Sequence, residues 1–220
     1  MEREVGNPRF PIWLLGDSNP KNWADKLTAP LDPRHPARHN IWTSVLDVIQ
    51  DSVFRKARLR VDTSELFIRN AIEEPDQKPK SVKGEWSVEN KKEVDDYGNL
   101  INEYKPRIII SFGSFSWEFL KRSAIKAALD GDLENSNGSS NNSQSKDLAQ
   151  IFWKSIEEFD PGKVNLLPLL HVSIARIHFL EAHANYCHDN KEGNYFEEVG
   201  EAIAIKLLQY KNDLNIWIER

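Results

Sequence analysis

Short apolar runs alternate along this chain with longer stretches in which apolar and polar residues recur at helical spacing. The apolar runs span residues 10–16, 66–70, 107–112 and 164–170, and Pro, Gly or charged residues bound them. Runs of this length between such breakers predict buried strands. Ile108, Ile109 and Ile110 stand in a row, which indicates that this strand is buried on both faces of a sheet.

The stretches between these runs have apolar residues three and four positions apart, which predicts amphipathic helices. The predicted helices cover residues 40–54, 88–104, 114–129, 149–159 and 195–210. Strands that alternate with helices at this spacing form parallel sheets with right-handed crossovers. The sequence therefore predicts a three-layer α/β fold, with a central four-stranded parallel sheet flanked by helices.

The composition is that of a folded protein with one domain. The chain has 220 residues, of which 40% are hydrophobic and 29% charged, and we expect residues 1–220 to form a single domain. Residues 130–146 are rich in Gly, Ser, Asn and Gln and lack apolar anchors, which predicts a flexible surface insert. A single cysteine, Cys187, excludes a disulfide framework. No apolar run approaches the roughly 20 residues of a membrane span and no signal peptide pattern opens the chain, so we expect a cytoplasmic protein without membrane contact.

Three of the predicted strands stop at a residue that can do chemistry. Gly16 and Asp17 follow the first strand, Asn70 ends the second, and His171 follows the fourth. In an open parallel sheet, the ligand crevice lies outside the carboxyl ends of the strands. We therefore expect a carboxylate, an amide and an imidazole to form one site.

Each of these residues also has a structural interpretation. Asp17 or Ser18 can cap a following helix, and Asn70 can stabilise a turn. His171 can be a hydrogen-bonded structural histidine, and Trp42 can belong to the core, beside Ile41 and Val45. A metal site is disfavoured: His178, His183, Cys187 and His188 have metal-binding side chains, but they lack the spacing of a known zinc motif. We expect neither a metal nor a cofactor.

The charge argues against broad, sequence-independent affinity for nucleic acid, because the net charge is −5 and such affinity needs a basic surface. Basic residues nevertheless cluster in two places, at residues 55–60 and 34–39. These clusters are either solvated faces or local contact surfaces.

Two families share motifs with the chain. The Gly-Asp-Ser triplet at residues 16–18 resembles the first block of GDS-type (SGNH) esterases, which would make Ser18 a nucleophile. The later blocks of that family, a Gly-x-Asn-Asp segment and a C-terminal Asp-x-x-His, are missing. The triplet alone is therefore a weak signal for an esterase.

Four segments, taken together and in order, resemble the uracil-DNA glycosylase superfamily, with a fifth similar to its mismatch-specific branch. The fifth is the helix start at residues 35–42. The first four are residues 16–20 (Gly-Asp-Ser-Asn-Pro), 66–72 (Leu-Phe-Ile-Arg-Asn-Ala-Ile), 105–114 (Lys-Pro-Arg-Ile-Ile-Ile-Ser-Phe-Gly-Ser) and 167–176 (Leu-Pro-Leu-Leu-His-Val-Ser-Ile-Ala-Arg). The resemblance covers roughly residues 10–180. It implies a single-domain enzyme that hydrolyses the N-glycosidic bond of a deaminated or damaged base in DNA, and we expect it to act as a monomer.

The resemblance implies a role for each motif residue. Asp17, or Asn19 in its place, would position the attacking water, and His171 would stabilise the departing base. Gly16, Asn70 and an aromatic ring, Trp42 or Trp23, would hold the flipped base. The DNA backbone would contact three further residues: Ser173, Arg176 and Ser114.

The chain also departs from the superfamily pattern. The thermophile-type branch carries four cysteines for an iron–sulfur cluster, whereas this chain has one cysteine, and Glu74 stands where that branch has the cysteine that follows its strand Asn. Val172 replaces the Pro between His and Ser, and the first motif aligns either on Gly16 or on Asn19. Two alternatives therefore stay open: a Ser18 esterase, and a nucleobase- or nucleic-acid-binding protein of the same fold without catalytic activity. The base that is recognised, and whether the DNA is single- or double-stranded, are open as well.

Overall fold

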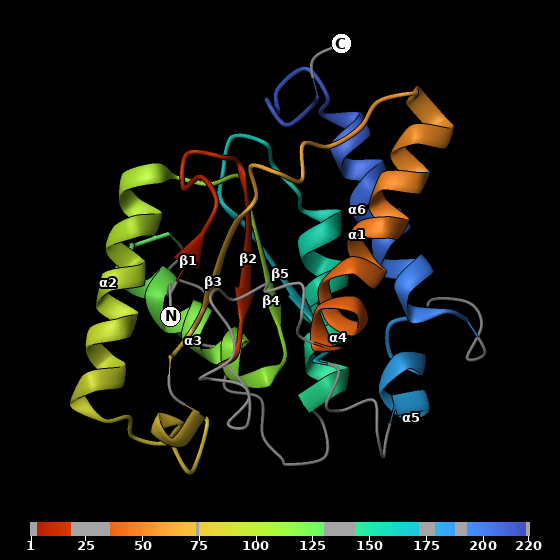
Figure 1. Ribbon diagram of the computed structural model, residues 1–220. Coiled ribbons are helices and arrows are strands. Elements are labelled where there is room, and N and C mark those ends of the chain that lie inside the picture. The colour runs from red at the N-terminus through yellow and green to blue at the C-terminus, as the bar shows by residue number, and fades with distance from the viewer. Residues whose placement is uncertain are drawn as a thin grey trace.

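The computed structural model shows an α/β fold, with helices on both faces of one central sheet (Figure 1). The structure describes residues 4–18, 36–73, 75–129, 144–171, 179–187 and 193–218, with the backbone alone at 36–42, 75, 144–145 and 179–181. The predicted class of α/β fold with a largely parallel, helix-flanked sheet is confirmed. None of the described helices is long and apolar enough to cross a membrane.

The sheet has five strands in the order β1-β3-β2-β4-β5. Their bounds are Glu4–Val5 (β1), Ile12–Gly16 (β2), Phe67–Asn70 (β3), Ile108–Phe112 (β4) and Asn165–Leu169 (β5). Strands β2 to β5 pair in parallel, as predicted, whereas β1 pairs antiparallel with β3. The prediction of four strands in an all-parallel sheet is therefore wrong. The two residues of β1 are too few to show a hydrophobic period, and only their pairing with β3 makes them a strand.

Six α-helices and one short 3-10 helix surround the sheet in the described residues. They are α1 (Pro36–Ala57), η1 (Pro75–Gln77), α2 (Val88–Tyr104), α3 (Ser114–Lys126), α4 (Gln144–Glu157), α5 (Phe179–Ala184) and α6 (Tyr195–Gln209). Helix α1 begins four residues earlier than predicted, at Pro36, because proline fits the first turn of a helix. Helix α4 begins at Gln144, so the last three residues of the predicted flexible insert are helical, and residues 130–143 lie outside the described residues. Helix α5 was not predicted, since six residues are too short to show a helical period.

Alternating residues of the parallel strands face the two helical layers. Trp13 of β2 packs against Tyr97 of α2, with ring centroids 5.8 Å apart, and Tyr97 packs against Phe119 of α3. Ile12 and Ile108 face the opposite layer, formed by α1 and α6. Figure 1 shows α2 and α3 on one side of the sheet, α1 and α6 on the other, and α4 beside β5.

A buried arginine joins the edge of the sheet to the α2 layer. Arg69 of β3 is 2% exposed, and its guanidinium lies 3.3 Å from Glu4 of β1 and 3.1 Å from Glu93 of α2. The same guanidinium lies 5.3 Å from the centre of the Tyr97 ring. Because a buried charge is costly unless it is paired, these contacts explain why so short a β1 stays on the sheet.

Candidate functional site at the carboxyl edge of the sheet

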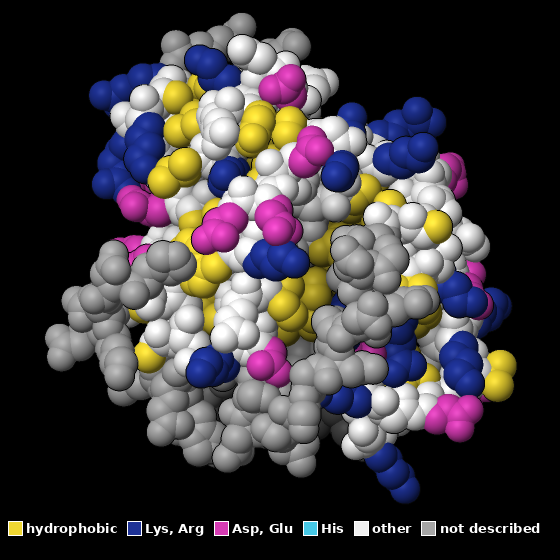
Figure 2. All heavy atoms as spheres, turned by 180° about the vertical axis from the view of Figure 1, so that it is seen from behind, with side chains coloured by type: hydrophobic (Ala, Val, Ile, Leu, Met, Phe, Trp, Pro, Cys, Tyr) yellow, Lys and Arg dark blue, Asp and Glu magenta, His cyan; other side chains and the backbone are white. Residues whose placement is uncertain are grey.

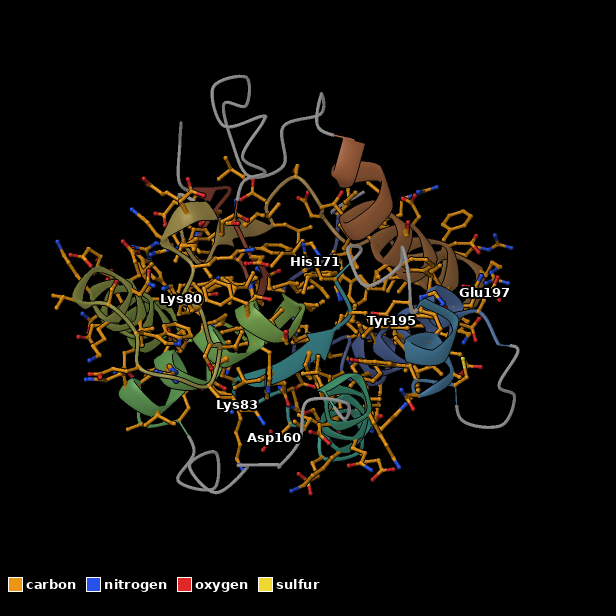
Figure 3. All side chains as sticks on the ribbon, turned by 90° about the horizontal axis from the view of Figure 1, so that it is seen from below. Lys80, Lys83, Asp160, His171, Tyr195 and Glu197 are labelled. Carbon is orange, nitrogen blue, oxygen red and sulfur yellow. The ribbon has the colours of Figure 1, made fainter. Side chains whose placement is uncertain are left out.

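The strand register brings the carboxyl ends of β3, β2, β4 and β5 side by side. Gly16 at the end of β2 pairs with Asn70 at the end of β3, and Phe112 of β4 pairs with Leu169 of β5. The residues that follow these ends are Asp17, Gly113 and, two residues after Leu169, His171. The structure therefore places Asp17, Asn70 and His171 along one edge of the sheet. Figure 3 looks onto this edge, with His171 between the segment of Lys80 and Lys83 on one side and Tyr195 on the other.

Asp17 leaves β2 with its carboxylate largely buried and paired with a cation. Its Oδ2 accepts a hydrogen bond from Nζ of Lys78 at 2.7 Å, and the two side chains are 16% and 37% exposed. Its backbone carbonyl accepts a bond from the amide of Ile72, just beyond the end of β3. Its Oδ1 is buried and has no hydrogen-bond partner within the described ranges. The carboxylate thus has one oxygen held by an ammonium group and one with unused accepting capacity among these residues.

Lys78 is a site residue that sequence reasoning missed. It follows the 3-10 helix η1, and the carbonyl of Gln77 accepts a bond of 2.8 Å from Nδ2 of Asn90 on α2, which is itself buried. The Lys78 ammonium also lies 5.7 Å from the ring centre of Phe115, in the first turn of α3. Its place in the chain could have identified Lys78 as a site residue. It lies in the loop that follows β3, and loops after strand ends line the crevice of an open sheet.

His171 stands just beyond β5, in a space that Gly113 leaves open. The Gly113 amide donates to the carbonyl of Leu169 at 2.8 Å, and Gly113 has a φ of +97°, which residues with a side chain rarely adopt. A Cβ added to Gly113 would lie 2.7 Å from Cβ of His171. On the other side, the hydroxyl of Tyr195 accepts a bond of 2.8 Å from the amide of Leu170. The main chain that leads into His171 is therefore fixed by Gly113, just beyond β4, and by α6.

The electrostatics of His171 link it to the other site residues. Burial lowers the pKa of His171 below its ordinary value, the carboxylate of Asp17 raises it in part, and the ammonium of Lys78 lowers it. These effects need Asp17 and Lys78 to lie near the imidazole. Because burial has the largest effect, the imidazole is neutral at neutral pH and offers one N–H donor and one acceptor nitrogen.

The remaining predicted residues fall into two groups. Asn70 is 6% exposed, Gly16 is buried and its carbonyl accepts a bond from the Ala71 amide, and Ser114 is the first residue of α3 at this same edge. Trp42 lies in α1, but its side chain is outside the described part of the structure. The other predicted residues lie outside the described residues altogether: Asn19, Trp23, Ser173 and Arg176.

The basic cluster at residues 55–60 lies far from this edge. It is at the end of α1, which points away from the carboxyl ends of the strands (Figure 1), and dark-blue side chains gather there in the upper left of Figure 2. Arg55 pairs with Asp51 and lies 3.6 Å from Glu201, while Arg58 and Arg60 lie over the ring of Phe54. The structure thus favours the solvated-face interpretation for this cluster. The side chains of residues 34–39 are not described.

An apolar cavity lies at the opposite end of the sheet and does not belong to the site. It has room for about one water molecule and lies between the sheet and the layer of α1 and α6. Gln50 and Thr63 are the polar residues in its lining, and the amide of Gln50 is bonded to the backbone of Val61 through both its nitrogen and its oxygen. This cavity is a packing defect rather than a binding site.

Within the described ranges, no three His, Cys, Asp or Glu side chains cluster as metal ligands do. Comparison of the chain with models of known families and with curated proteins finds no match. The geometry of the carboxyl edge is therefore the main guide to function.

Proposed function

We propose that this protein is a glycosylase of the uracil-DNA glycosylase type, which hydrolyses the N-glycosidic bond of a deaminated or damaged base in DNA. The observation that carries the proposal is the meeting of Asp17, Asn70 and a neutral His171 at one edge of the sheet. The sequence resemblance assigns these same residues to the sugar, the base edge and the leaving base. Their positions at the ends of β3, β2 and β5, along the same edge of the sheet, support that assignment.

The Asp17 carboxylate suits the sugar side of the reaction. Breaking the bond between the base and C1′ leaves positive charge on the sugar, which a nearby carboxylate stabilises. The same group can accept a proton from an attacking water. Oδ1 of Asp17 is buried and has accepting capacity among the described residues, while Lys78 holds Oδ2 and so orients the carboxylate.

His171 suits the departing base. The base leaves with negative charge on its carbonyl oxygen, and a neutral imidazole can donate its N–H to that oxygen. Burial and the Lys78 charge keep the pKa of His171 low, so the neutral form is available near neutral pH.

Asn70 suits the edge of the base. A carboxamide presents a donor and an acceptor together, which matches the N–H and C=O neighbours on the edge of a pyrimidine. Asn70 is buried at the end of β3, with 6% of its surface exposed. A flipped base is read by such contacts once it has left the duplex, at a cost of a few kcal/mol.

The test is incubation with oligonucleotides, single- and double-stranded, that carry uracil, hypoxanthine or mismatched thymine. An abasic product is revealed by alkaline strand cleavage. We expect Asp17→Asn and His171→Gln each to slow base release by about 10²–10⁴-fold, the usual contribution of a positioned acid–base group. Asp95→Asn is the matched control, because Asp95 is an exposed carboxylate on α2 that pairs with Lys126.

Two other outcomes would replace the proposal. Tight binding of uracil-containing strands without an abasic product would identify a nucleic-acid-binding protein that lacks the chemistry. Turnover of simple esters that is lost in Ser18→Ala, with no base release from any strand, would identify the esterase. Ser18 is half-buried beside Asp17, so this variant tests the hydroxyl with little change in volume.

A further inference from the structure

The Lys78 amine is bonded to the carboxylate that would take the proton of the attacking group in the proposed reaction. A nucleophile in such a site is hydrogen-bonded to the carboxylate that takes its proton, so that it is held beside C1′ of the sugar. Nζ of Lys78 has this relation to Asp17, with a distance of 2.7 Å to Oδ2. The other oxygen, Oδ1, has no partner among the described residues and is left for a water.

We propose that Lys78 is a nucleophilic amine that forms an imine with C1′ of an abasic deoxyribose held at the carboxyl edge of the sheet. The identity of the sugar rests on the proposed function, whose product is such an abasic site. The class of ligand is an aldehyde, since an abasic deoxyribose opens from its ring form to expose one at C1′.

The surroundings of Lys78 hold the amine in place rather than leave it on a mobile surface arm. The bond from Asn90 to the Gln77 carbonyl fixes the backbone immediately before it, and the Phe115 ring lies beneath the ammonium. Four other lysine–carboxylate pairs of the described residues leave the lysine side chain more than half exposed, namely those of Lys91, Lys126, Lys154 and Lys163. Lys121 is more buried, at 13% exposed, but its partner Glu118 lies on the same helix, α3, whereas Lys78 pairs with a residue just beyond the carboxyl end of β2.

The chemistry balances with the groups present. Asp17 takes one proton from the Lys78 ammonium, and the free amine adds its electron pair to the C1′ aldehyde. The oxygen of the former aldehyde leaves as water, with one proton from the nitrogen and the other returned by Asp17. The product is a protonated imine between Nζ and C1′, beside the regenerated carboxylate of Asp17, and sodium borohydride reduces it to a stable secondary amine by delivering hydride to C1′.

The experiment uses the full chain and an oligonucleotide in which removal of uracil has already produced one abasic site. Protein and strand are incubated with sodium borohydride, and the covalent adduct is detected on a denaturing gel and located by peptide mass spectrometry. We expect one adduct, on Lys78. Asp17→Asn should slow adduct formation, because its amide cannot take the proton.

Lys78→Arg is the decisive variant. Arginine keeps the positive charge and the pairing with Asp17 but is not a nucleophilic amine, so we expect loss of the adduct without loss of the fold. Lys80→Arg is the matched control, since Lys80 is an exposed lysine two residues away, and it should leave the adduct unchanged. An adduct of equal yield in Lys78→Arg, an adduct mapped to other lysines, or no adduct in the wild type would overturn the proposal.

This experiment can contradict the role of Lys78 and the proposed glycosylase function independently of each other. The abasic strand is supplied ready-made, so an adduct on Lys78 stands even if the protein removes no base by itself. Release of uracil without any adduct would support the proposed glycosylase function and overturn the proposal for Lys78. The nucleophile would then be water, held by Oδ1 of Asp17.

Discussion

Gly113 and His171 share a space that has room for only one side chain. Alanine at position 113 would place its Cβ 2.7 Å from Cβ of His171 and would keep a backbone with φ of +97°. Strain of this kind costs about 1–3 kcal/mol, so we expect Gly113→Ala to lower the free energy of unfolding by that amount and to displace the imidazole. Urea unfolding and the imidazole NMR signals measure the two effects.

Gly162→Ala is the control for this variant. A Cβ at Gly162 meets only the flexible carboxylate of Asp160, at 3.1 Å, and the backbone φ there is not positive. Gly162→Ala should therefore lower the free energy of unfolding by less than Gly113→Ala does. Equal losses in the two variants, with unchanged imidazole signals, would show that His171 does not depend on the space beside Gly113.

The pKa of His171 should respond in opposite directions to its two charged neighbours. Removing the negative charge in Asp17→Asn should lower the pKa further, whereas removing the positive charge in Lys78→Met should raise it toward the ordinary value. Titration of the imidazole by NMR gives both values. Shifts of the same sign, or no shift in either variant, would mean that the three groups do not face one another.

Sequence reasoning reached some of these residues and not others for a physical reason. The apolar runs predict where the strands end, and three of the candidate residues stand at those ends: Asp17, Asn70 and His171. The local sequence was therefore enough to find them. Lys78 is in a loop, and it reaches Asp17 only because Asn90, on a different element, binds the Gln77 carbonyl. That contact joins residues 13 apart, and no local pattern of polar and apolar positions reveals it.

The first turn of α6 supports the end of β5. The hydroxyl of Tyr195 accepts the Leu170 amide, and the ring stacks on the imidazole of His183, with centroids 4.6 Å apart. Tyr195→Phe would leave a buried amide without its partner, which costs about 1–3 kcal/mol. We expect this loss in urea unfolding, together with a changed environment of His171, one residue further on.

Tyr210→Phe gives the comparison, because the Tyr210 hydroxyl makes a longer bond of 3.4 Å to the Phe159 carbonyl in a less buried position. Removal of the Tyr210 hydroxyl should lower the free energy of unfolding by less than removal of the Tyr195 hydroxyl, and it should leave the NMR signals of His171 unchanged. If both variants lose the same stability and neither moves the His171 signals, the bond from Leu170 to Tyr195 does not position the imidazole.

Helix and strand predictions succeeded where local signals were complete. Helix α2 begins and ends where the sequence predicts, because Ser87 caps its amino end by accepting from the Asn90 amide and the apolar face runs through all its turns. Strand β1 and helix α5 have two and six residues, too few to show a period. Whether such short elements form depends on contacts with the rest of the folded chain. For β1 these contacts are the pairing with β3 and the ion pair of Glu4 with Arg69.

The chain as a whole separates its basic cluster from its candidate site. Residues 55–60 lie at the end of α1 away from the carboxyl ends of the strands, and the net charge is −5. A DNA strand at the site would therefore gain little from that cluster, and its affinity would depend on contacts at the edge itself. If the proposed function holds, this arrangement would favour recognition of one unusual nucleotide over broad attraction to the backbone.

Acid should destabilise the whole fold through His183, which is buried. His183 is 7% exposed, and burial lowers its pKa to about 4. The unfolded chain has an ordinary histidine pKa of about 6.5, so between about pH 6.5 and about pH 4 it binds a proton that the folded chain does not. Stability from this group is therefore complete above pH 6.5 and is lost as the pH falls through that window.

The variant His183→Phe isolates this effect, because it keeps a flat ring against Tyr195 but cannot take up a proton. We expect the unfolding free energy of the wild type to fall more steeply than that of the variant between pH 6.5 and 4, in matched urea titrations. Carboxylates that titrate in the same range are common to both proteins and cancel in the difference. Parallel curves would show that His183 can be protonated without unfolding, which would require solvent or an anionic partner to reach the imidazole inside the layer of α5 and α6.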